Sequence, residues 1–543
     1  MISAPAHLVR LGRAGFVFAR EGVFGLIDPA MVPVAARPLL RLARLFERRG
    51  SGAAETRLSV ALTRLGPSYV KLGQFLATRP DVVGAALARD LERLQDQMPP
   101  FPQAEAEAAV AASFGKPITS LFLSFGPAVA AASIAQVHRA EVHRAEVHRA
   151  EVHRAEVHHA EVGTATAPRA VAVKVLRPGV ERRFHADLAA FTFVARHAEN
   201  LSAEARRLRL IEVVDTLRRS VAVEMDFRLE AAALSEMAEN TKDDPDFRVP
   251  AVDWDRTTKE VLTLEWVDAT PLSDRTRLLA KGFDLPQVAR ALIQTFLRHA
   301  LRDGFFHADM HPGNLFVGDD GRLIAVDFGI MGRLGVKERL FLAEILHGFI
   351  TRDYHRTAEV HFEAGYVPPQ HSVEGFAQAI RAIGEPIHNR TAEDISMAKL
   401  LTLLFEVTGL FDMRTRPELL LLQKTMVVVE GVARSLDPKL DMWSTAEPVV
   451  REWMARHLGP AGKLENAAAG MGEIGRFIGN VPALLMRGAR ILDRLDDITR
   501  DGLLLLSPQT LAEIKRAETR LARWTVGALW VIAAVLLWIA LRQ

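Results

Sequence analysis

The chain contains 543 residues, of which 49% are hydrophobic and 25% are charged. These values are typical of globular proteins and exclude wholesale disorder, and the length predicts three or four domains of about 150 residues each. The 68 Lys and Arg nearly balance the 66 Asp and Glu, so the net charge of +2 argues against a strongly basic nucleic-acid-binding protein. Cysteine is absent, which excludes disulfides, thiolate zinc sites, Cys-ligated iron–sulfur clusters and Cys nucleophiles.

The first fifty residues form a basic segment, with eight arginines against three acidic residues and no apolar run long enough for a secretory signal peptide. Apolar residues recur there at helical spacing, for example Leu8, Leu11 and Phe18. Two interpretations remain open. A basic amphipathic helix can rest on anionic lipid headgroups, or it can present a solvated basic face while it packs against the main body of the protein.

Periodicity and turn residues place the next elements. A Pro-rich break at 99–102 ends a first helical stretch, and Gly-Asp-Asp-Gly at 318–321 marks a turn between two short apolar runs. Short runs of β-branched residues predict buried strands, and longer amphipathic stretches predict helices. We expect strands at 170–175 and 261–267, and helices at 55–100, 210–240, 286–303 and 336–510. Strands followed by many helices predict an α+β core with a helical lobe.

A five-residue repeat lies between two of these elements. The unit HRAEV starts at His138, His143, His148 and His153, and the variant HHAEV starts at His158. Five residues on a helix offset successive histidines by about 140°, and on a strand an odd period alternates faces. Neither geometry gathers three histidines around a metal ion. We therefore interpret the repeat as a tandem expansion, with copies 143–162 inserted ahead of the Lys174 strand.

The C-terminus carries an apolar segment, Trp524 to Leu541, with 18 residues and no charge. At a rise of ~1.5 Å per residue it spans about 27 Å, close to the thickness of a bilayer core. Trp524 and Trp538 lie near its ends as interfacial anchors would, and four basic residues between 515 and 523 precede it. We expect a single transmembrane helix with the body on the cytoplasmic side. A buried core helix or an oligomer contact is the alternative interpretation.

Residues with the spacing that phosphoryl transfer requires lie between 306 and 329. Asp309 precedes Asn314 by five residues, and Asp327 opens an Asp-Phe-Gly sequence 18 residues after Asp309. In protein kinases these positions orient the accepting hydroxyl, hold a metal ion and bridge that metal to the phosphates. Lys174, in Val-Ala-Val-Lys-Val, matches the lysine that cradles the α- and β-phosphates. The order and spacing together predict a kinase-like site.

Further motifs make the chain similar to the UbiB-like atypical kinases, a family linked to ubiquinone biosynthesis. The resemblance covers most of residues 5–450. It rests on a KxGQ motif, an Ala-rich loop in place of the usual Gly-rich loop, an ExD motif, a catalytic HxDxHPxN motif and the DFG motif. These are Lys71–Gln74, Ala130–His138, Glu224–Asp226, His307–Asn314 and Asp327–Gly329, respectively.

The resemblance implies an atypical protein-kinase-like two-lobed α+β fold with an N-terminal helical extension, binding ATP (or ADP) and Mg²⁺. It implies catalytic roles for Asp309, Lys174 and Glu230, with Glu230 paired with Lys174, and metal binding by Asn314 and Asp327. The nucleotide contacts that it implies come from Ala130, Ala131, Ala132, Ser133, Gln136, Lys174 and Glu265. The implied regulatory residues are Lys71, Gln74, Glu224 and Asp226, with Glu224 paired with Lys71.

Helical geometry can be compared with these implied pairings. Lys71 and Gln74 are three residues apart, and Asp226 and Glu230 are four apart, so each pair shares a helical face. Glu224 lies about 240° around a helix from Glu230, so the two glutamates should have different partners. Apart from the resemblance, a Lys71–Glu224 pair is expected to be a surface salt bridge worth ~0.5 kcal/mol.

The Ala-rich loop and the repeat behind it raise one further question. Alanine largely forbids the positive φ that glycine allows, so this loop should hold nucleotide differently from a Gly-rich loop. If the extra copies loop out, the fold survives, because closure entropy grows only logarithmically with loop length. If they shift the Ala-rich loop, nucleotide affinity changes.

The expected domains are an N-terminal helical extension (1–100), a kinase-like core (101–345), a helical region (346–510) and the transmembrane helix (524–541). The resemblance implies an inner-membrane atypical kinase or ATPase that supports ubiquinone biosynthesis at the polyprenylphenol hydroxylation stage or by presenting a precursor. The partners that it implies are prenylated quinone precursors or other lipids, ubiquinone biosynthesis enzymes and the membrane, with no nucleic acid. In the family, the N-terminal extension covers the place where a protein substrate would dock, which disfavours protein kinase activity.

Three alternatives accompany this prediction. The site could transfer phosphate to a lipid or another small molecule, or the protein could be a nucleotide-binding scaffold without turnover. It could also be the hydroxylase of the pathway itself, but the sequence has no flavin fingerprint and no cysteine to ligate haem.

Overall fold

The computed structural model describes residues 4–26, 37–48, 57–77, 98–142, 168–201, 203–387, 409–413 and 417–458, with five isolated positions (83, 87, 91, 94 and 407). It divides into two compact units, one made of residues 1–65, 189–197 and 457–543 and the other of 66–188 and 198–456. The predicted transmembrane segment 524–541 and the repeat copies 143–162 lie outside the described residues. Among the helices that are described, none has the length and apolar character needed to span a bilayer.

The first unit is helical. It contains α1 (Ala4–Arg20), η1 (Val23–Leu26), α2 (Arg37–Leu45), α3 (Arg57–Leu65) and the middle of α8 (Val180–Leu201). Some of its arginines make contacts within the unit: Arg57 lies 2.6 Å from a carboxylate oxygen of Glu47, and Arg64 pairs with Glu21. These two arginines belong to α3, beyond the basic segment of the first fifty residues, and they pair with two of the three acidic residues of that segment.

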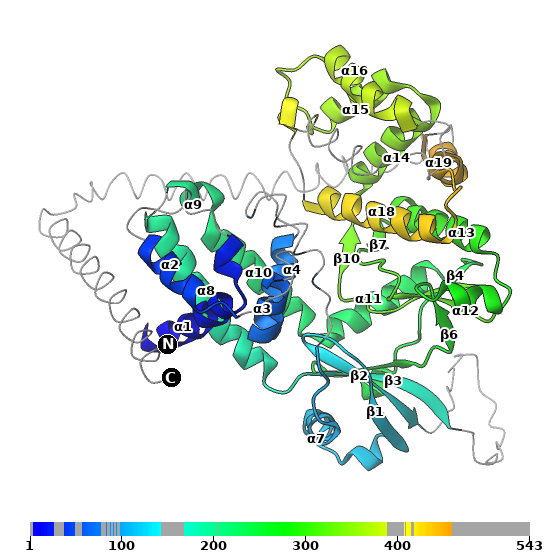
Figure 1. Cartoon of the computed structure of the whole chain (residues 1–543). Coiled ribbons are helices and arrows are strands. Elements are labelled where there is room, and N and C mark those ends of the chain that lie inside the picture. The colour runs from blue at the N-terminus through cyan, green and yellow to red at the C-terminus, as the bar shows by residue number, and fades with distance from the viewer. Residues whose placement is uncertain are drawn as a thin grey trace, which may run out of the picture. The chain divides into compact units, whose positions relative to one another are not determined.

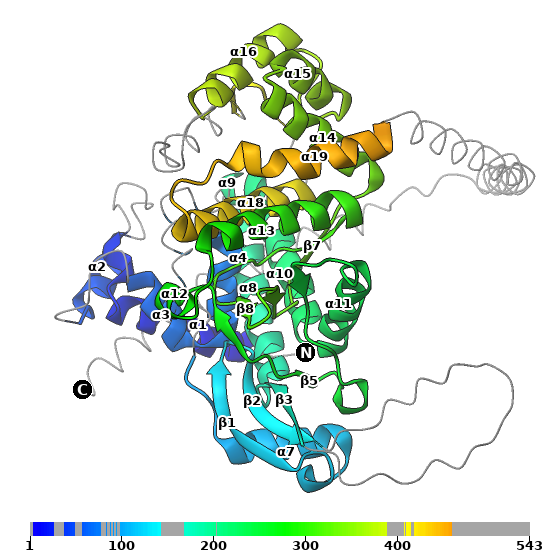
Figure 2. The same ribbon diagram turned by 90° about the vertical axis from the view of Figure 1, so that its right-hand side faces the viewer.

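The second unit contains a four-stranded antiparallel sheet in the order β1-β2-β3-β5 (Figures 1 and 2). Its strands are β1 (Ser124–Ala131), β2 (Ala135–Val142), β3 (Arg169–Leu176) and β5 (Val261–Glu265). Alternate residues Val171, Val173 and Val175 of β3 are fully buried in a core that also includes Val110 of α7 (Gln103–Phe114). The strands expected at 170–175 and 261–267 are therefore present, and their β-branched residues form the core of this small lobe.

The helix expected at 210–240 is two helices, α10 (Leu210–Glu224) and α11 (Phe227–Asn240). Asp226 lies between them with extended backbone, accepts a hydrogen bond from the Arg228 N–H and so caps α11. Its carboxylate also pairs with the Arg228 side chain at 2.7 Å. The expectation that Asp226 and Glu230 share one helical face is wrong, because local capping by Asp competes with helix continuation. The helix break, and not rotation along one helix, separates Glu224 from Glu230.

The large lobe of this unit combines small sheets with helices. Strands β4 (Phe247–Arg248), β9 (Leu323–Ala325), β8 (Leu315–Gly318) and β6 (Ala269–Pro271) form one sheet, and β7 (Phe305–His307) pairs with β10 (Met331–Arg333). Helix α13 (Leu285–Arg298) runs beside α18 (Pro417–Leu436) in both views (Figures 1 and 2). The remaining helices are α9 (Ala203–Leu208), α12 (Arg275–Ala280), α14 (Val336–Thr351), α15 (Tyr354–Glu363), α16 (Val373–Gly384) and α19 (Met442–Leu458).

Two expected helices end differently from the sequence prediction. The stretch expected at 55–100 contains α3 and α4 (Pro67–Ala77), separated at Gly66, whose φ of 104° is a conformation that favours glycine. The stretch expected at 286–303 is α13 followed by a π-helical turn, His299–Asp303, that ends at Gly304 with φ 64°. This turn leads directly into β7 and the predicted catalytic loop.

Candidate active site

Two of the predicted site residues, Glu230 and Asp327, contact a third, Lys174. Lys174 on β3 directs its Nζ to the two carboxylate oxygens of Glu230 on α11, at 2.9 and 3.0 Å, and to Oδ1 of Asp327 at 2.8 Å. The Lys174 and Glu230 side chains are 16% and 6% exposed, whereas Asp327 is 50% exposed. The fold therefore brings together residues that are more than fifty positions apart in the chain.

The three charges change one another's pKa. Burial raises the pKa of Glu230 to about 7, against the opposing effect of Lys174. The Lys174 charge lowers the pKa of Asp327 to about 2. Burial alone would lower the pKa of Lys174, but Asp327 and Glu230 outweigh it and raise that pKa well above its usual value. Lys174 is therefore a cation throughout the physiological range, and Asp327 is its fully ionised partner.

The backbone conformation of Asp327 is unusual for a residue other than glycine. Its φ is 63°, in the left-handed region, which aspartate tolerates better than most residues. The metal-binding role that the resemblance implies for Asp327 remains a prediction.

His307 holds the loop after β7 that is predicted to be catalytic. The buried imidazole of His307 accepts the Asp309 N–H at Nδ1 (3.1 Å), so its Nε2–H donates to the Val326 carbonyl (3.1 Å). Burial lowers the pKa of His307 and keeps it neutral. Asn314 donates its amide N–H to the carboxylate of Asp309 at 3.0 Å and to the Asp309 carbonyl at 3.1 Å. Asp309 and Asn314 thus lie side by side, as their five-residue spacing predicts.

The helical region beyond the kinase-like core also contacts this loop. The hydroxyl of Thr425, buried on α18, lies 3.1 Å from the carbonyl of Ala308, the residue between His307 and Asp309. No motif marks Thr425, and sequence reasoning missed it. The only available signal was the 3.6-residue periodicity that predicted a buried helix.

The Ala-rich stretch forms a hairpin. Ala130 and Ala131 end β1, Ala132 and Ser133 lie in the turn, and the Ala132 N–H donates to Ala135. Gln136, on β2, has its side chain bonded to the backbone of Phe101 and to His138. The predicted nucleotide contacts of these residues remain predictions.

Glu265, the other predicted nucleotide contact, ends β5. Its carboxylate accepts hydrogen bonds from the Arg248 guanidinium at 3.0 Å and from the Ala251 N–H at 3.2 Å. The side chain thus joins β5 to β4 and to the segment that follows β4. A role for Glu265 in binding nucleotide remains a prediction.

Lys71 of the KxGQ motif pairs with Glu224 of the ExD motif. The Lys71 Nζ on α4 lies 2.6 Å from a Glu224 carboxylate oxygen at the end of α10, and the two side chains are only 12% and 13% exposed. The Lys71 charge also contributes to lowering the pKa of Asp327. Gln74 lies one turn further along α4. The pairing that the resemblance implies is therefore present, and it is more buried than an ordinary surface salt bridge.

Reversing one charge of this pair should destabilise the protein. Lys71→Glu is expected to lower the free energy of unfolding by about 3–5 kcal/mol, because it leaves poorly solvated carboxylates facing each other. The double variant Lys71→Glu/Glu224→Lys should recover most of that loss in urea unfolding. Lys281→Glu is the control, because Lys281 pairs at 2.7 Å with the 75% exposed Asp319, and its loss should stay below about 1 kcal/mol. If Lys71→Glu and Lys281→Glu lost equal amounts of unfolding free energy, burial of the Lys71–Glu224 pair would not explain the loss.

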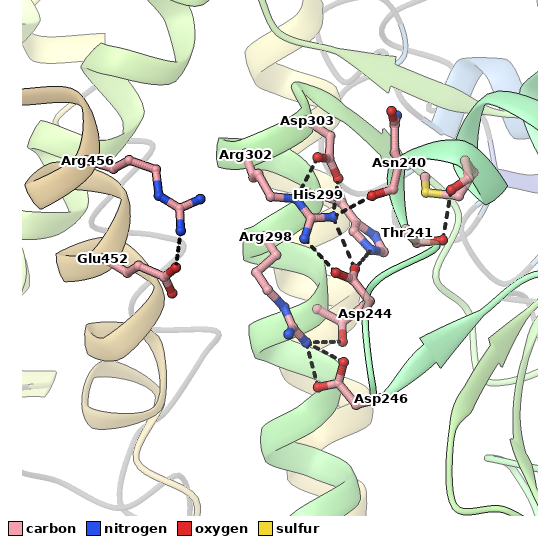
Figure 3. Close-up of polar contacts among 12 residues, drawn as sticks. Asn240, Thr241, Asp244, Asp246, Arg298, His299, Arg302, Asp303, Glu452 and Arg456 are labelled. Atoms are coloured by element: carbon pink, nitrogen blue, oxygen red, sulfur yellow. Dashed lines mark hydrogen bonds and ion pairs between the residues drawn. The ribbon is translucent and has the colours of Figure 1, made fainter. Parts of the chain in front are cut away.

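A charged network joins the end of α11 to the turn before β7 (Figure 3). The Arg302 guanidinium bonds Asp244 at 2.5 and 3.1 Å, Asp303 at 2.7 and 2.8 Å and the Asn240 carbonyl at 3.0 Å. The buried His299 lies 3.5 Å from Asp244. The Arg302 guanidinium therefore joins the helix that carries Glu230 to the segment that leads to Asp309.

This network should make stability sensitive to acid. Burial lowers the pKa of His299, which faces Asp244, Asp303, Arg302 and the Phe247 ring. Because the unfolded chain then binds a proton more readily than the folded protein, the folded state loses stability as the pH falls below about 6.5. Between pH 7.5 and 5.5, His299→Gln should therefore lose less stability than the wild type in urea unfolding. His355→Gln, at a 58% exposed position, should behave like the wild type; a His299→Gln slope equal to that of the wild type would contradict the expectation.

The fold and the site define the class of the protein. The small sheet with its lysine, the helix with its paired glutamate and the Asp-Asn and Asp-Phe-Gly loops are those of a kinase-like α+β protein. The description "ABC1 atypical kinase-like domain" matches residues 93–153 and 149–361, and "UbiB helical domain" matches residues 380–441.

A relative identifies the family. The chain is 37% identical over 469 residues to "Probable protein kinase UbiB" of Marinobacter nauticus, which covers 85% of this chain and 81% of the relative. The protein therefore belongs to the UbiB family of atypical kinases. The solved complex of Rv3197 with erythromycin from Mycobacterium tuberculosis matches 77% of this chain and 97% of its own, at 23% identity and a TM-score of 0.47.

Proposed function

We propose that the protein binds ATP with Mg²⁺, hydrolyses it and supports ubiquinone biosynthesis. The observation that supports this most strongly is the Lys174–Glu230–Asp327 contact beside the Asp309–Asn314 pair. It brings the lysine that positions phosphates, the glutamate that holds it, a metal-binding carboxylate and the catalytic carboxylate into one unit. The biosynthetic role comes from the family and from the name of the Marinobacter nauticus relative.

The donor set fits Mg²⁺. Carboxylate and amide oxygens are the ligands that this cation prefers, and Asp327 and Asn314 supply one of each. Bound there, the cation would neutralise the phosphate oxygens during transfer. Asp309, held by the Asn314 amide and by the His307 ring, would orient the attacking water and accept its proton.

Nucleotide binding requires a rearrangement of charge at Lys174. In the structure, Asp327 occupies one side of the Lys174 ammonium at 2.8 Å. Phosphate oxygens would replace that contact while Glu230 keeps its own, and Asp327 would then turn to the cation.

We further propose that residues 524–541 anchor the chain in an inner membrane with the catalytic body on the cytoplasmic face. The uncharged run and the basic residues ahead of it support this orientation. In this setting the substrate of the pathway, a prenylated precursor, would be within reach, and ATP hydrolysis would drive its extraction or presentation. A chain that ends at residue 523 should leave the membrane fraction at alkaline pH, and its retention there would contradict the anchor.

Quinone profiling tests the biosynthetic role. A deletion strain should lack ubiquinone and accumulate a prenylated precursor; the wild-type gene should restore the quinone, and Asp327→Asn should not. Normal ubiquinone in the deletion strain would overturn the pathway assignment. Mass spectrometry can detect whether a phosphorylated lipid forms in proportion to the ATP consumed. Such a product would show that the site transfers phosphate to a lipid, and it would refute the proposed ATP hydrolysis.

A further inference from the structure

The first copy of the five-residue repeat is part of the folded core. Strand β2 (Ala135–Val142) has the sequence AQVHRAEV and includes the first HRAEV unit. It pairs with β1 on one side and β3 on the other, and Val137 lies opposite Lys174. The position of this strand therefore fixes both the Ala-rich turn before it and the strand that carries the phosphate-positioning lysine.

The sequence contains near-copies of the whole strand. Windows that read AEVHRAEV start at residues 140, 145 and 150, and AEVHHAEV starts at residue 155. A strand that slips by an odd number of residues normally turns its buried face to solvent. Here a slip of five residues replaces each side chain of β2 with an identical one, except at one position. The usual penalty against slippage is thus absent from most of the strand.

The exception is Gln136, which becomes glutamate in every later window. Gln136 is buried, with only 1% of its surface exposed. Its oxygen accepts the Phe101 N–H at 2.9 Å, while its amide nitrogen lies 3.3 Å from the Phe101 carbonyl and 2.8 Å from Nε2 of His138. The other ring nitrogen of His138 lies 2.9 Å from the Gly126 carbonyl and so carries the proton that it donates there.

A glutamate cannot reproduce these contacts. Its carboxylate has no N–H for the Phe101 carbonyl or for the lone pair of a neutral His138, and burial lowers the pKa of His138 and keeps that ring neutral. Two of the three hydrogen bonds of the side chain would become oxygen–oxygen or oxygen–nitrogen repulsions around a buried charge. The residue ahead of the strand also changes, from Ile134 to arginine, in all four later windows.

We propose that Gln136 is a positioning residue that selects the first copy of the repeat as strand β2. By excluding the later windows it sets the length of the Ala-rich turn, residues 132–134, and places Val137 opposite Lys174. A slip of one copy would add five residues to that turn and remove five from the connection to β3. This inference concerns the folding register and does not depend on the proposed function, because its test needs no nucleotide.

The absence of cysteine makes the register directly measurable. Arg139 lies opposite Ala172 in the β2–β3 pairing, so the pair Arg139→Cys/Ala172→Cys reports the first copy by forming a disulfide under mild oxidation. Arg144→Cys/Ala172→Cys reports a slip of one copy. The pair Glu146→Cys/Ala172→Cys measures chance collisions, because residue 146 corresponds to Glu141, which lies opposite Ala170.

With Gln136 in place, the Arg139→Cys pair should cross-link efficiently and the Arg144→Cys pair should stay at the collision background. Gln136→Glu should raise the Arg144→Cys cross-link by about tenfold or more, the ratio expected for lost buried hydrogen bonds. Glu141→Gln is the complementary variant, because it gives the second window the sequence AQVHRAEV and leaves Gln136 and its contacts unchanged. It should raise the same cross-link even if Gln136→Glu fails to fold. An Arg144→Cys cross-link that stays at background in Glu141→Gln, or that already exceeds background in the wild-type sequence, would overturn the proposal.

Discussion

Replacing Asp309 with asparagine should lower the rate of ATP hydrolysis by about 10²–10⁴-fold, the usual contribution of a positioned general base. The change is nearly isosteric, and the asparagine side chain can still contact the amide of Asn314, which lies 3.0 Å from the Asp309 carboxylate. The fold and the affinity for nucleotide should therefore change little. Phosphate release at saturating Mg²⁺ and ATP measures the rate, and equilibrium binding of a labelled nucleotide measures the affinity.

The control for this variant is Asp319→Asn, which removes a carboxylate that is 75% exposed, follows β8 in the turn and pairs with Lys281. It should hydrolyse ATP at the wild-type rate. If Asp309→Asn binds nucleotide and restores ubiquinone as well as the wild type does, turnover is not required. The protein would then act as a nucleotide-binding scaffold, and the proposed hydrolysis would be refuted.

The residues around Lys174 could be predicted because their chemistry fixes their spacing in the sequence. Asp309 and Asn314 are five positions apart in one loop, and Asp327 follows a short hairpin, so local sequence determines their geometry. Glu230 was assigned only through the family resemblance, since 56 residues separate it from Lys174 and no periodicity links them.

Other features could not be predicted, because a sequence pattern does not show which of two competing interactions a residue makes. Asp226 could continue a helix or cap the next one, and its hydrogen bond to the Arg228 N–H decides for the cap. The contacts of Thr425 and Arg302 join segments that lie far apart in the sequence, so no short motif announces them. The first repeat unit was not predicted as a strand, yet pairing with β3 makes it a core strand.

Lys174→Met should have a large effect on stability. It removes the cation that lies within 3.0 Å of Glu230 and Asp327 and leaves Glu230, which is 6% exposed, without its countercharge. Loss of one partner from a buried ion pair lowers the free energy of unfolding by about 3–5 kcal/mol. Nucleotide affinity should fall as well, because the phosphate-positioning ammonium is gone.

The pH dependence of this loss identifies its cause. The pKa of Glu230 is already about 7 in the wild type, above its unfolded value of about 4.5, so the wild type loses stability as the pH rises toward 7 and no further above it. Without Lys174 the pKa of Glu230 rises again, so the variant continues to lose stability above pH 7. The difference in unfolding free energy between the two proteins should therefore be larger at pH 8.5 than at pH 6.

The double variant Lys174→Met/Glu230→Leu separates stability from function. It removes the uncompensated carboxylate and fills the same space with an apolar side chain, so it should recover most of the lost stability, as replaced buried ion pairs often do. Nucleotide binding should stay as weak as in Lys174→Met, because recovery of the fold does not return the ammonium. A double variant as unstable as the single one would mean that Lys174 stabilises the small lobe through its packing on the Phe227 ring, 5.4 Å away, and not by neutralising Glu230.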